Sequence, residues 1–180
     1  MDYRRSLAKG ASFFFTAVTE NRRPVLCDGE NVSLLKEATK YVMDRHAFKL
    51  DAYVILPDHL HCVWALPEGD NDYSNRWLII KSYFSRKCDL KYKQPVSSSR
   101  IRKKEQAIWQ RRFWEHQLRD EADFARHVEY IHYNPVKHGL ADAPHKWAYS
   151  SFHCYVEEGV YEKEWASDSD ILFDGETGNE

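Results

Sequence analysis

The sequence predicts an α+β protein with a ferredoxin-like core, in which the elements follow the order β-α-β-β-α-β and one additional C-terminal helix comes last. Two kinds of pattern predict this order. Short runs rich in aromatic and β-branched residues are typical of strands, and longer stretches with apolar residues three or four positions apart are typical of helices. Such an order predicts an antiparallel sheet with helices on one face.

The first strand and helix are clear. Residues 12–19 contain three phenylalanines and end in Ala-Val-Thr, which indicates a strand. Asp28 and Gly29 then mark a turn. Residues 32–48 carry apolar side chains at helical spacing, and Ser33 is placed to cap that helix.

The middle of the chain predicts a hairpin and a second helix. Residues 50–56 and 60–66 form two apolar runs on either side of Pro57 and Asp58, which are turn residues. Residues 73–87 return to helical spacing, with aromatic and aliphatic side chains on one side.

After a basic loop, residues 107–117 predict the last strand and residues 123–133 the additional helix. Pro135 has no N–H to donate and disfavours helical geometry at Asn134. We therefore expect the helix to end or kink at Asn134. Packed on the open face of the sheet, this helix would bring Tyr130 opposite the strand of residues 60–66.

The length and composition indicate a single folded domain over residues 1–166 and an acidic tail over 167–180, which we expect to be disordered. Hydrophobic residues make up 43% and aromatic residues 14% of the 180-residue chain, too many for a disordered protein. We find neither a membrane-length apolar run nor a leader-like segment. The four cysteines form no Cys-x-x-Cys pair, which predicts reduced thiols and a cytoplasmic protein.

The net charge of −2 hides a strong asymmetry. The segment from Arg76 to Arg112 contains twelve Lys or Arg residues and two acidic ones, whereas Glu157–Glu180 contains nine acidic residues and one Lys. A basic arm in an acidic protein is typical of a polyanion-binding surface. An exposed loop that needs charge for solubility is the simpler alternative.

His59 and His61 lie two residues apart in an apolar strand, so their imidazoles face the same way. Two histidines on a strand are common as core or surface groups. The apolar surroundings favour a functional site, because each imidazole would otherwise need a hydrogen-bond partner. Cys62 has the opposite parity and is interpreted as a core residue.

On the last helix, Tyr130 and Asn134 are four residues apart and share a face. Two imidazoles, an amide oxygen and a phenol make a metal site with a nucleophile beside it, which suits cleavage of a phosphodiester bond. Tyr133 is the competing phenol. His127 and His132 are either proton-transfer groups or surface residues.

Taken together, the motifs of this chain closely resemble those of the REP-associated tyrosine transposases, which belong to the superfamily of His-hydrophobic-His nucleases. The resemblance extends from about residue 3 to residue 165. Its motifs are Tyr3-Arg4-Arg5, Phe13-Phe14-Phe15-Thr16, Leu56-Pro57-Asp58-His59-Leu60-His61, Trp109-Gln110-Arg111-Arg112-Phe113-Trp114-Glu115, Tyr130-Ile131-His132-Tyr133-Asn134-Pro135-Val136-Lys137 and Trp147-Ala148-Tyr149-Ser150-Ser151-Phe152-His153.

The resemblance implies a metal-dependent endonuclease and strand-transferase that acts on single-stranded DNA through a 5′-phosphotyrosine intermediate. Its substrates would be hairpin-forming repetitive extragenic palindromes (REPs), which would place the protein at the nucleoid. His59, His61 and Asn134 would bind Mg²⁺ or Mn²⁺, and Tyr130 would be the catalytic nucleophile. Dimeric relatives assemble their sites between chains, whereas this branch is expected to be monomeric.

The resemblance also implies that Tyr3, Arg4 and Arg5 read the sequence at the foot of the hairpin. Basic side chains of the central segment are expected to hold DNA phosphates. They are Lys81, Arg86, Lys87, Arg102, Lys103, Lys104, Arg111 and Arg112.

Three other functions compete with this one: a DNA-hairpin-binding regulator without catalysis, a metal hydrolase that uses water and forms no covalent adduct, and an RNA-binding ferredoxin-like domain. The last lacks the usual aromatic signature of RNA-recognition motifs.

Overall fold

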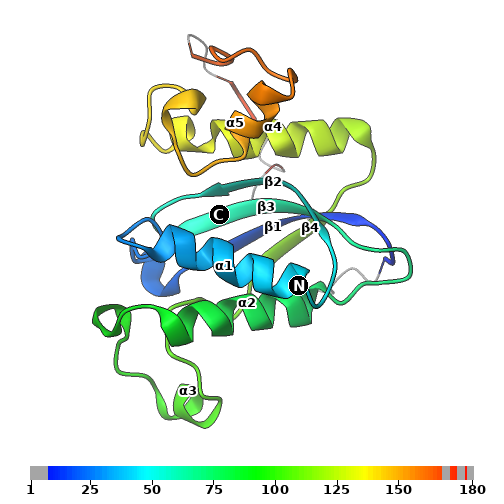
Figure 1. The fold of residues 1–180 in the computed structure, drawn as a ribbon. Helices are drawn as coiled ribbons and strands as arrows, with labels where there is room; N and C mark the ends of the chain where they lie inside the picture. Colours follow the sequence, from blue (N-terminus) through cyan, green and yellow to red (C-terminus); the bar gives the residue numbers. More distant parts are fainter. Residues whose placement is uncertain (1–7, 168–170, 174–176, 178–180) are drawn as a thin grey trace.

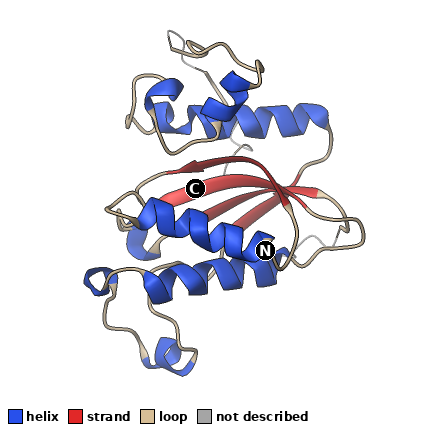
Figure 2. Ribbon diagram, in the orientation of Figure 1, coloured by secondary structure: helices blue, strands red, loops and turns tan. Residues whose placement is uncertain are grey.

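The structure is a computed structural model that describes residues 8–167, 171–173 and 177. Four strands form one antiparallel sheet in the order β2-β3-β1-β4 (Figure 2). The strands are β1 (Ser12–Val18), β2 (Lys49–Ile55), β3 (His59–Ala65) and β4 (Trp114–Gln117).

Helices cover both faces of this sheet. In Figure 1, α1 and α2 lie on one face, and α4 crosses the opposite face with α5 beside it. The helices are α1 (Asn31–Met43), α2 (Tyr73–Lys87), α3 (Ser98–Arg102), α4 (Glu121–Lys137) and α5 (Phe152–Glu157), with short 3-10 helices at Glu20–Arg22, Leu90–Tyr92 and Pro144–Lys146. The predicted α+β class, ferredoxin-like order and additional helix are confirmed.

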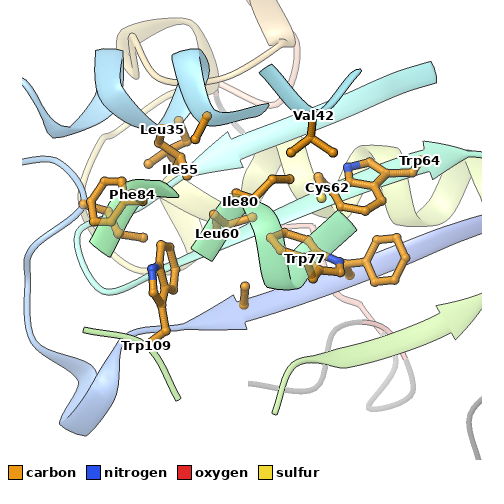
Figure 3. Close-up of a cluster of buried hydrophobic side chains, with 14 of the residues drawn as sticks. Leu35, Val42, Ile55, Leu60, Cys62, Trp64, Trp77, Ile80, Phe84 and Trp109 are labelled. Carbon is orange, nitrogen blue, oxygen red and sulfur yellow. The ribbon is translucent and has the colours of Figure 1, made fainter. Parts of the chain in front are cut away.

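Alternation along β1 divides the core into two layers. Phe13 and Phe15 pack toward α1 and α2, in the cluster that includes Trp64 and Trp77 (Figure 3). Phe14 points to the other face and packs against Tyr130 of α4. The same parity places Cys62 in the α1–α2 layer, as predicted.

Two predicted boundaries were too generous. Helix α1 ends at Met43 and not at residue 48, because residues 44–47 are exposed and offer no apolar stripe to bury. Strand β4 begins at Trp114 and not at residue 107, since the chain turns at Ala107, whose φ is +51°. Such a left-handed conformation cannot continue a strand.

The last helix was predicted to end or kink at Asn134, and it does not end there. Helix α4 continues through Pro135 to Lys137. Beyond Lys137 the chain leaves the helix at Gly139, whose φ is +66°; the Gly139 N–H donates to the Val136 carbonyl and the Leu140 N–H donates to the Pro135 carbonyl. This pair of hydrogen bonds is a Schellman ending. The helix therefore lacks one internal hydrogen bond at Pro135 but continues for two more residues, and Gly139 prevents it from going further.

The outer edge of β2 is covered by the segment that follows α4. Val54 forms a bridge with Ser150, the Ile55 N–H donates to the Tyr149 carbonyl at 2.8 Å, and the Ser151 N–H donates to the Tyr53 carbonyl at 2.9 Å. An uncovered edge strand is a template for pairing with another chain. Here the protein's own backbone occupies this part of the edge.

Within the described residues, no helix is both long and apolar enough to cross a membrane. Most of the acidic tail predicted to be disordered lies outside the described residues. Of its described part, Phe173 packs against the rings of Tyr130 and Tyr133.

His132 connects α4 to α5 and to Ser151, the residue just before α5. Its Nε2 lies 2.8 Å from the Ser151 hydroxyl, and its ring packs against Phe152 and Tyr155. Burial lowers the pKa of His132 to about 3. The folded protein therefore keeps this imidazole neutral.

We expect His132 to make stability depend on pH. Between about pH 6.5, the ordinary pKa of histidine, and about pH 3, the unfolded chain binds a proton here that the folded chain does not, so stability falls as the pH is lowered through this range. His132→Gln should make the dependence shallower by up to about 1.4 kcal/mol per pH unit. Urea unfolding between pH 4 and 7 measures it, with exposed His46→Gln as the control. An unchanged slope in His132→Gln would contradict this assignment.

Candidate functional site

The two histidines of β3 lie side by side beneath α4. Their ring centroids are 5.0 Å apart, and their side chains are almost fully buried. Both belong to the face of the sheet opposite α1 and α2, because they share the parity of Val63 along β3 and pair in register with Val18 and Thr16 of β1. The prediction that His59 and His61 face the same way agrees with this geometry.

Each imidazole is oriented by a hydrogen bond at Nδ1. His59 Nδ1 lies 2.6 Å from Asp58 Oδ1, and His61 Nδ1 lies 2.8 Å from the Thr16 hydroxyl. Contacts of this kind fix the ring of a metal-binding histidine and direct Nε2 to the ion. Burial alone would raise the pKa of Asp58, but the hydrogen bond with His59 and the Arg22 guanidinium at 3.1 Å outweigh it and lower that pKa.

Tyr130 of α4 lies against this pair. Its ring is 1% exposed and its centroid is 5.4 Å from that of His61. Asn134 follows one helical turn later and is fully buried. The structure thus brings Tyr130 to the histidines predicted from the sequence and places Asn134 on the same helix face.

The competing phenol and the two other histidines of α4 have different neighbours from Tyr130. His127 contacts Asp123, and His132 contacts Ser151 on the side of α5. Tyr133 packs against Phe173. Tyr130, in contrast, has its ring in contact with that of His61.

Lys137 is a site residue that sequence reasoning missed. Its ammonium nitrogen lies 2.8 Å from the Tyr130 hydroxyl and 4.7 Å from the centre of the Tyr130 ring. Residues seven apart share a helix face. A helix expected to end at Asn134 could not make this contact, whereas α4 includes Lys137 because it continues through Pro135.

The side chains present fit a divalent metal ion. Two buried imidazoles, each held by a hydrogen bond at Nδ1, and one buried amide oxygen supply nitrogen and oxygen donors. Imidazole nitrogens suit borderline ions such as Zn²⁺, whereas an amide oxygen suits Mn²⁺ and Mg²⁺, of which Mg²⁺ usually keeps several waters.

A basic groove lies beside α2 and α3. Its lining residues come from positions 78–111, after His59 and His61 in the chain. Of the predicted DNA-binding residues, five line it: Lys81, Arg86, Lys103, Lys104 and Arg111. Arg100 also lines the groove and is paired with Glu20 and Glu105, and Arg111 pairs with the same Glu105 at 2.9 Å. We define this surface, lined by residues of α2, α3 and the loop up to Arg111, as the basic groove.

Other predicted contacts fall outside the basic groove. Lys87 pairs with Glu37 of α1 at 2.8 Å. Arg102 and Arg112 are exposed but do not line the groove. Tyr3, Arg4 and Arg5 lie outside the described residues.

Residues 9–134 match the protein family described as Transposase IS200 like. A REP-associated tyrosine transposase of Escherichia coli (strain K12) is 42% identical over 167 residues, which cover 93% of this chain and 92% of the relative. The chain belongs to the REP-associated tyrosine transposases. A Haemophilus influenzae protein with the same family name is 39% identical over 97% of this chain and 98% of its own length.

The fold agrees with that of a solved REP-associated tyrosine transposase. This structure is of a transposase bound to a REP hairpin; it superposes with a TM-score of 0.82 at 37% identity, covering 99% of this chain and 98% of the other. The family resemblance predicted from the motifs is therefore confirmed.

The contact between Lys137 and Tyr130 predicts a catalytic effect. If the Tyr130 oxygen attacks DNA, the ammonium group would stabilise negative charge on that oxygen, and Lys137→Met should slow DNA cleavage by about 10- to 100-fold. Single-turnover cleavage of a labelled REP hairpin, measured together with its Kd, checks this expectation. Lys146→Met is the matched control, because Lys146 pairs with Asp142 away from the site. A loss of affinity that accounts for the whole loss of rate would assign Lys137 to DNA binding instead.

Proposed function

We propose that this transposase is a metal-dependent single-stranded DNA endonuclease and strand-transferase that acts on REP hairpins through a 5′-phosphotyrosine intermediate. The observation that carries the proposal is the buried contact of Tyr130 with His61 on one side and with Lys137 on the other. A purely structural tyrosine would need one hydrogen-bond partner for its buried hydroxyl, which Lys137 supplies, but it would not need an adjoining pair of oriented histidines.

In the proposed reaction, the Tyr130 oxygen attacks the scissile phosphorus and a new P–O bond forms. The bond from phosphorus to the 3′-oxygen of the preceding nucleotide breaks, and that oxygen takes up a proton to become a 3′-hydroxyl. The phenolic proton is released to water, and the Lys137 ammonium stabilises the charge left on the phenolic oxygen. Attack by another 3′-hydroxyl on the phosphotyrosine reverses these changes and joins strands.

His59, His61 and Asn134 are the proposed metal ligands. A divalent ion held there would polarise the scissile phosphate and stabilise the charge that develops on it. Asp58 and Thr16 hold the two imidazoles in position by hydrogen bonds, so that little rearrangement is needed when an ion binds.

The basic groove is the proposed binding surface for the phosphates of the hairpin. The solved relative is bound to a REP hairpin, and this chain carries lysines and arginines from two separate segments around one hollow. Side chains that contact phosphates and not base edges would add affinity without sequence preference. Tyr3, Arg4 and Arg5 remain the proposed readers of sequence.

We propose a monomer as the active form, with its site built within one chain. Helix α4 packs on β2 and β3 of its own sheet. The edge of β2, through which a second sheet could pair, is covered by residues 149–151. Both features support a self-contained site, and DNA as substrate would place the protein in the cytoplasm at the nucleoid.

Tyr130→Phe tests the nucleophile. This variant should form no covalent adduct with a labelled single-stranded REP hairpin in Mn²⁺ or Mg²⁺, while it binds the hairpin as the wild type does, because only the attacking oxygen is removed. Denaturing electrophoresis detects the adduct, and Tyr133→Phe is the matched control. Cleavage by Tyr130→Phe at the wild-type rate would sink the assignment. Hairpin binding by the wild type without cleavage or adduct would support a DNA-binding regulator.

Lys103→Ala combined with Lys104→Ala tests the basic groove. Loss of two phosphate contacts should lower affinity for the hairpin about 5- to 30-fold at moderate salt and reduce the slope of log K against log salt by roughly 1.4. Fluorescence anisotropy between 50 and 300 mM NaCl measures both quantities. The pair Lys40→Ala and Lys146→Ala, on other exposed surfaces, is the control. An unchanged salt slope in the groove variant would remove the groove from the binding surface.

A further inference from the structure

A second group of potential metal ligands lies between β4 and α4. It consists of His116 from β4 with Asp123 and His127 from the first two turns of α4, and is called here the β4–α4 cluster. The candidate ligand atoms of the three residues lie within 4.8 Å of one another. No sequence motif points to His116 or Asp123, because the way the chain turns between Gln117 and Glu121 decides whether their side chains meet.

The donor atoms are spaced as ligands of one ion. His116 Nε2 lies 2.9 Å from Asp123 Oδ2, and His127 Nδ1 lies 3.2 Å from Asp123 Oδ1. In a tetrahedral zinc site with bonds of about 2.0–2.1 Å, neighbouring donor atoms are roughly 3.3 Å apart. Each imidazole therefore lies at about this distance from one oxygen of the Asp123 carboxylate. Because the three candidate ligand atoms lie within 4.8 Å of one another, the side chains would need to draw together by at most about 1.5 Å to surround one ion.

The charge states also suit a metal site. Burial alone would raise the pKa of Asp123, but hydrogen bonds from His116 and from the Arg119 main chain outweigh it and lower that pKa to about 2. Burial lowers the pKa of His127. At neutral pH the cluster therefore presents an anionic carboxylate and a neutral buried imidazole, the forms that bind metal ions.

The cluster is closed on one side and open on the other. The side chains of Asp123 and His127 are 4% and 3% exposed, whereas that of His116 is 23% exposed, which gives water access as a fourth ligand. Arg119 Nε is 3.4 Å from Asp123 Oδ2, but its side chain is 67% exposed and can move into solvent. An ion on His127 Nδ1 would also replace the hydrogen bond of that nitrogen with the Asp123 main-chain oxygen.

We propose that His116, Asp123 and His127 form a second metal site, for a borderline divalent ion of the Zn²⁺ class, that links β4 to the first turns of α4. Two imidazoles with one carboxylate are a donor set for Zn²⁺ more than for Mg²⁺. The site differs from that of His59 and His61, because the ring of Phe14 packs against both His61 and His127 and lies between the two groups. Bound metal would hold in place the start of the helix that carries Tyr130.

The decisive experiment counts metal ions in the full chain after removal of bound metal with a chelator. The chain is titrated with Co²⁺, which gives intense visible absorption in a tetrahedral site, and with Zn²⁺ in equilibrium dialysis followed by elemental analysis. The variant His59→Gln with His61→Gln isolates the β4–α4 cluster. We expect it to bind one Zn²⁺ per chain at micromolar concentration and to show the Co²⁺ absorption bands.

His116→Gln in that background should remove the bands and weaken Zn²⁺ binding at least 10-fold. Because His116 is partly exposed, this variant tests the ligand without opening the core, and far-UV circular dichroism verifies its fold. No Zn²⁺ bound by the His59→Gln, His61→Gln chain, or binding that does not change with His116→Gln, would show that the cluster is a hydrogen-bonded network and overturn the proposal.

Discussion

The packing of α4 on the open face of the sheet is the contact on which the rest of the structure depends. Three of the four predicted site side chains are completely or almost completely buried in this contact because they face each other from β3 and α4, and Asn134 is buried on the same helix. Phe14 and Val63 of the sheet, with Val128 and Ile131 of the helix, supply the apolar part of the contact. Apolar burial thus provides the attraction that holds a polar site together.

Burying so many polar groups is costly unless each has a partner. The chain meets this requirement partly with near neighbours and partly with distant ones. Asp58 is adjacent to His59 in sequence, and Lys137 is two turns from Tyr130 on one helix, whereas Thr16 reaches His61 from another strand. Hydrogen bonds to near neighbours in the sequence depend only on local chain geometry, whereas the one from β1 requires the sheet.

The segment of residues 147–155, which follows α4, covers the edge of β2 and holds α4 against the sheet. Its backbone pairs with β2, its Trp147 indole donates to the Ile55 carbonyl at 3.0 Å, and its Tyr155 hydroxyl donates to the Asp51 carbonyl at 2.9 Å. His132 of α4 contacts the Ser151 hydroxyl and so connects the same segment to α4. These bonds cover the sheet edge and hold α4 to it at the same time, which is consistent with a site completed within one chain.

The sequence by itself determined the order of the elements, the shared face of His59 and His61, and the spacing of Tyr130 and Asn134, since each follows from the period of a strand or helix. The structure was needed to show that α4 continues through Pro135 to Lys137, although the Schellman hydrogen bonds that close the helix at Gly139 are local to the chain. Tertiary structure alone decided which lysines gather at the basic groove, and that His116 meets Asp123 and His127. These pairings join residues whose distance in space depends on how the elements pack, and no local period encodes that packing.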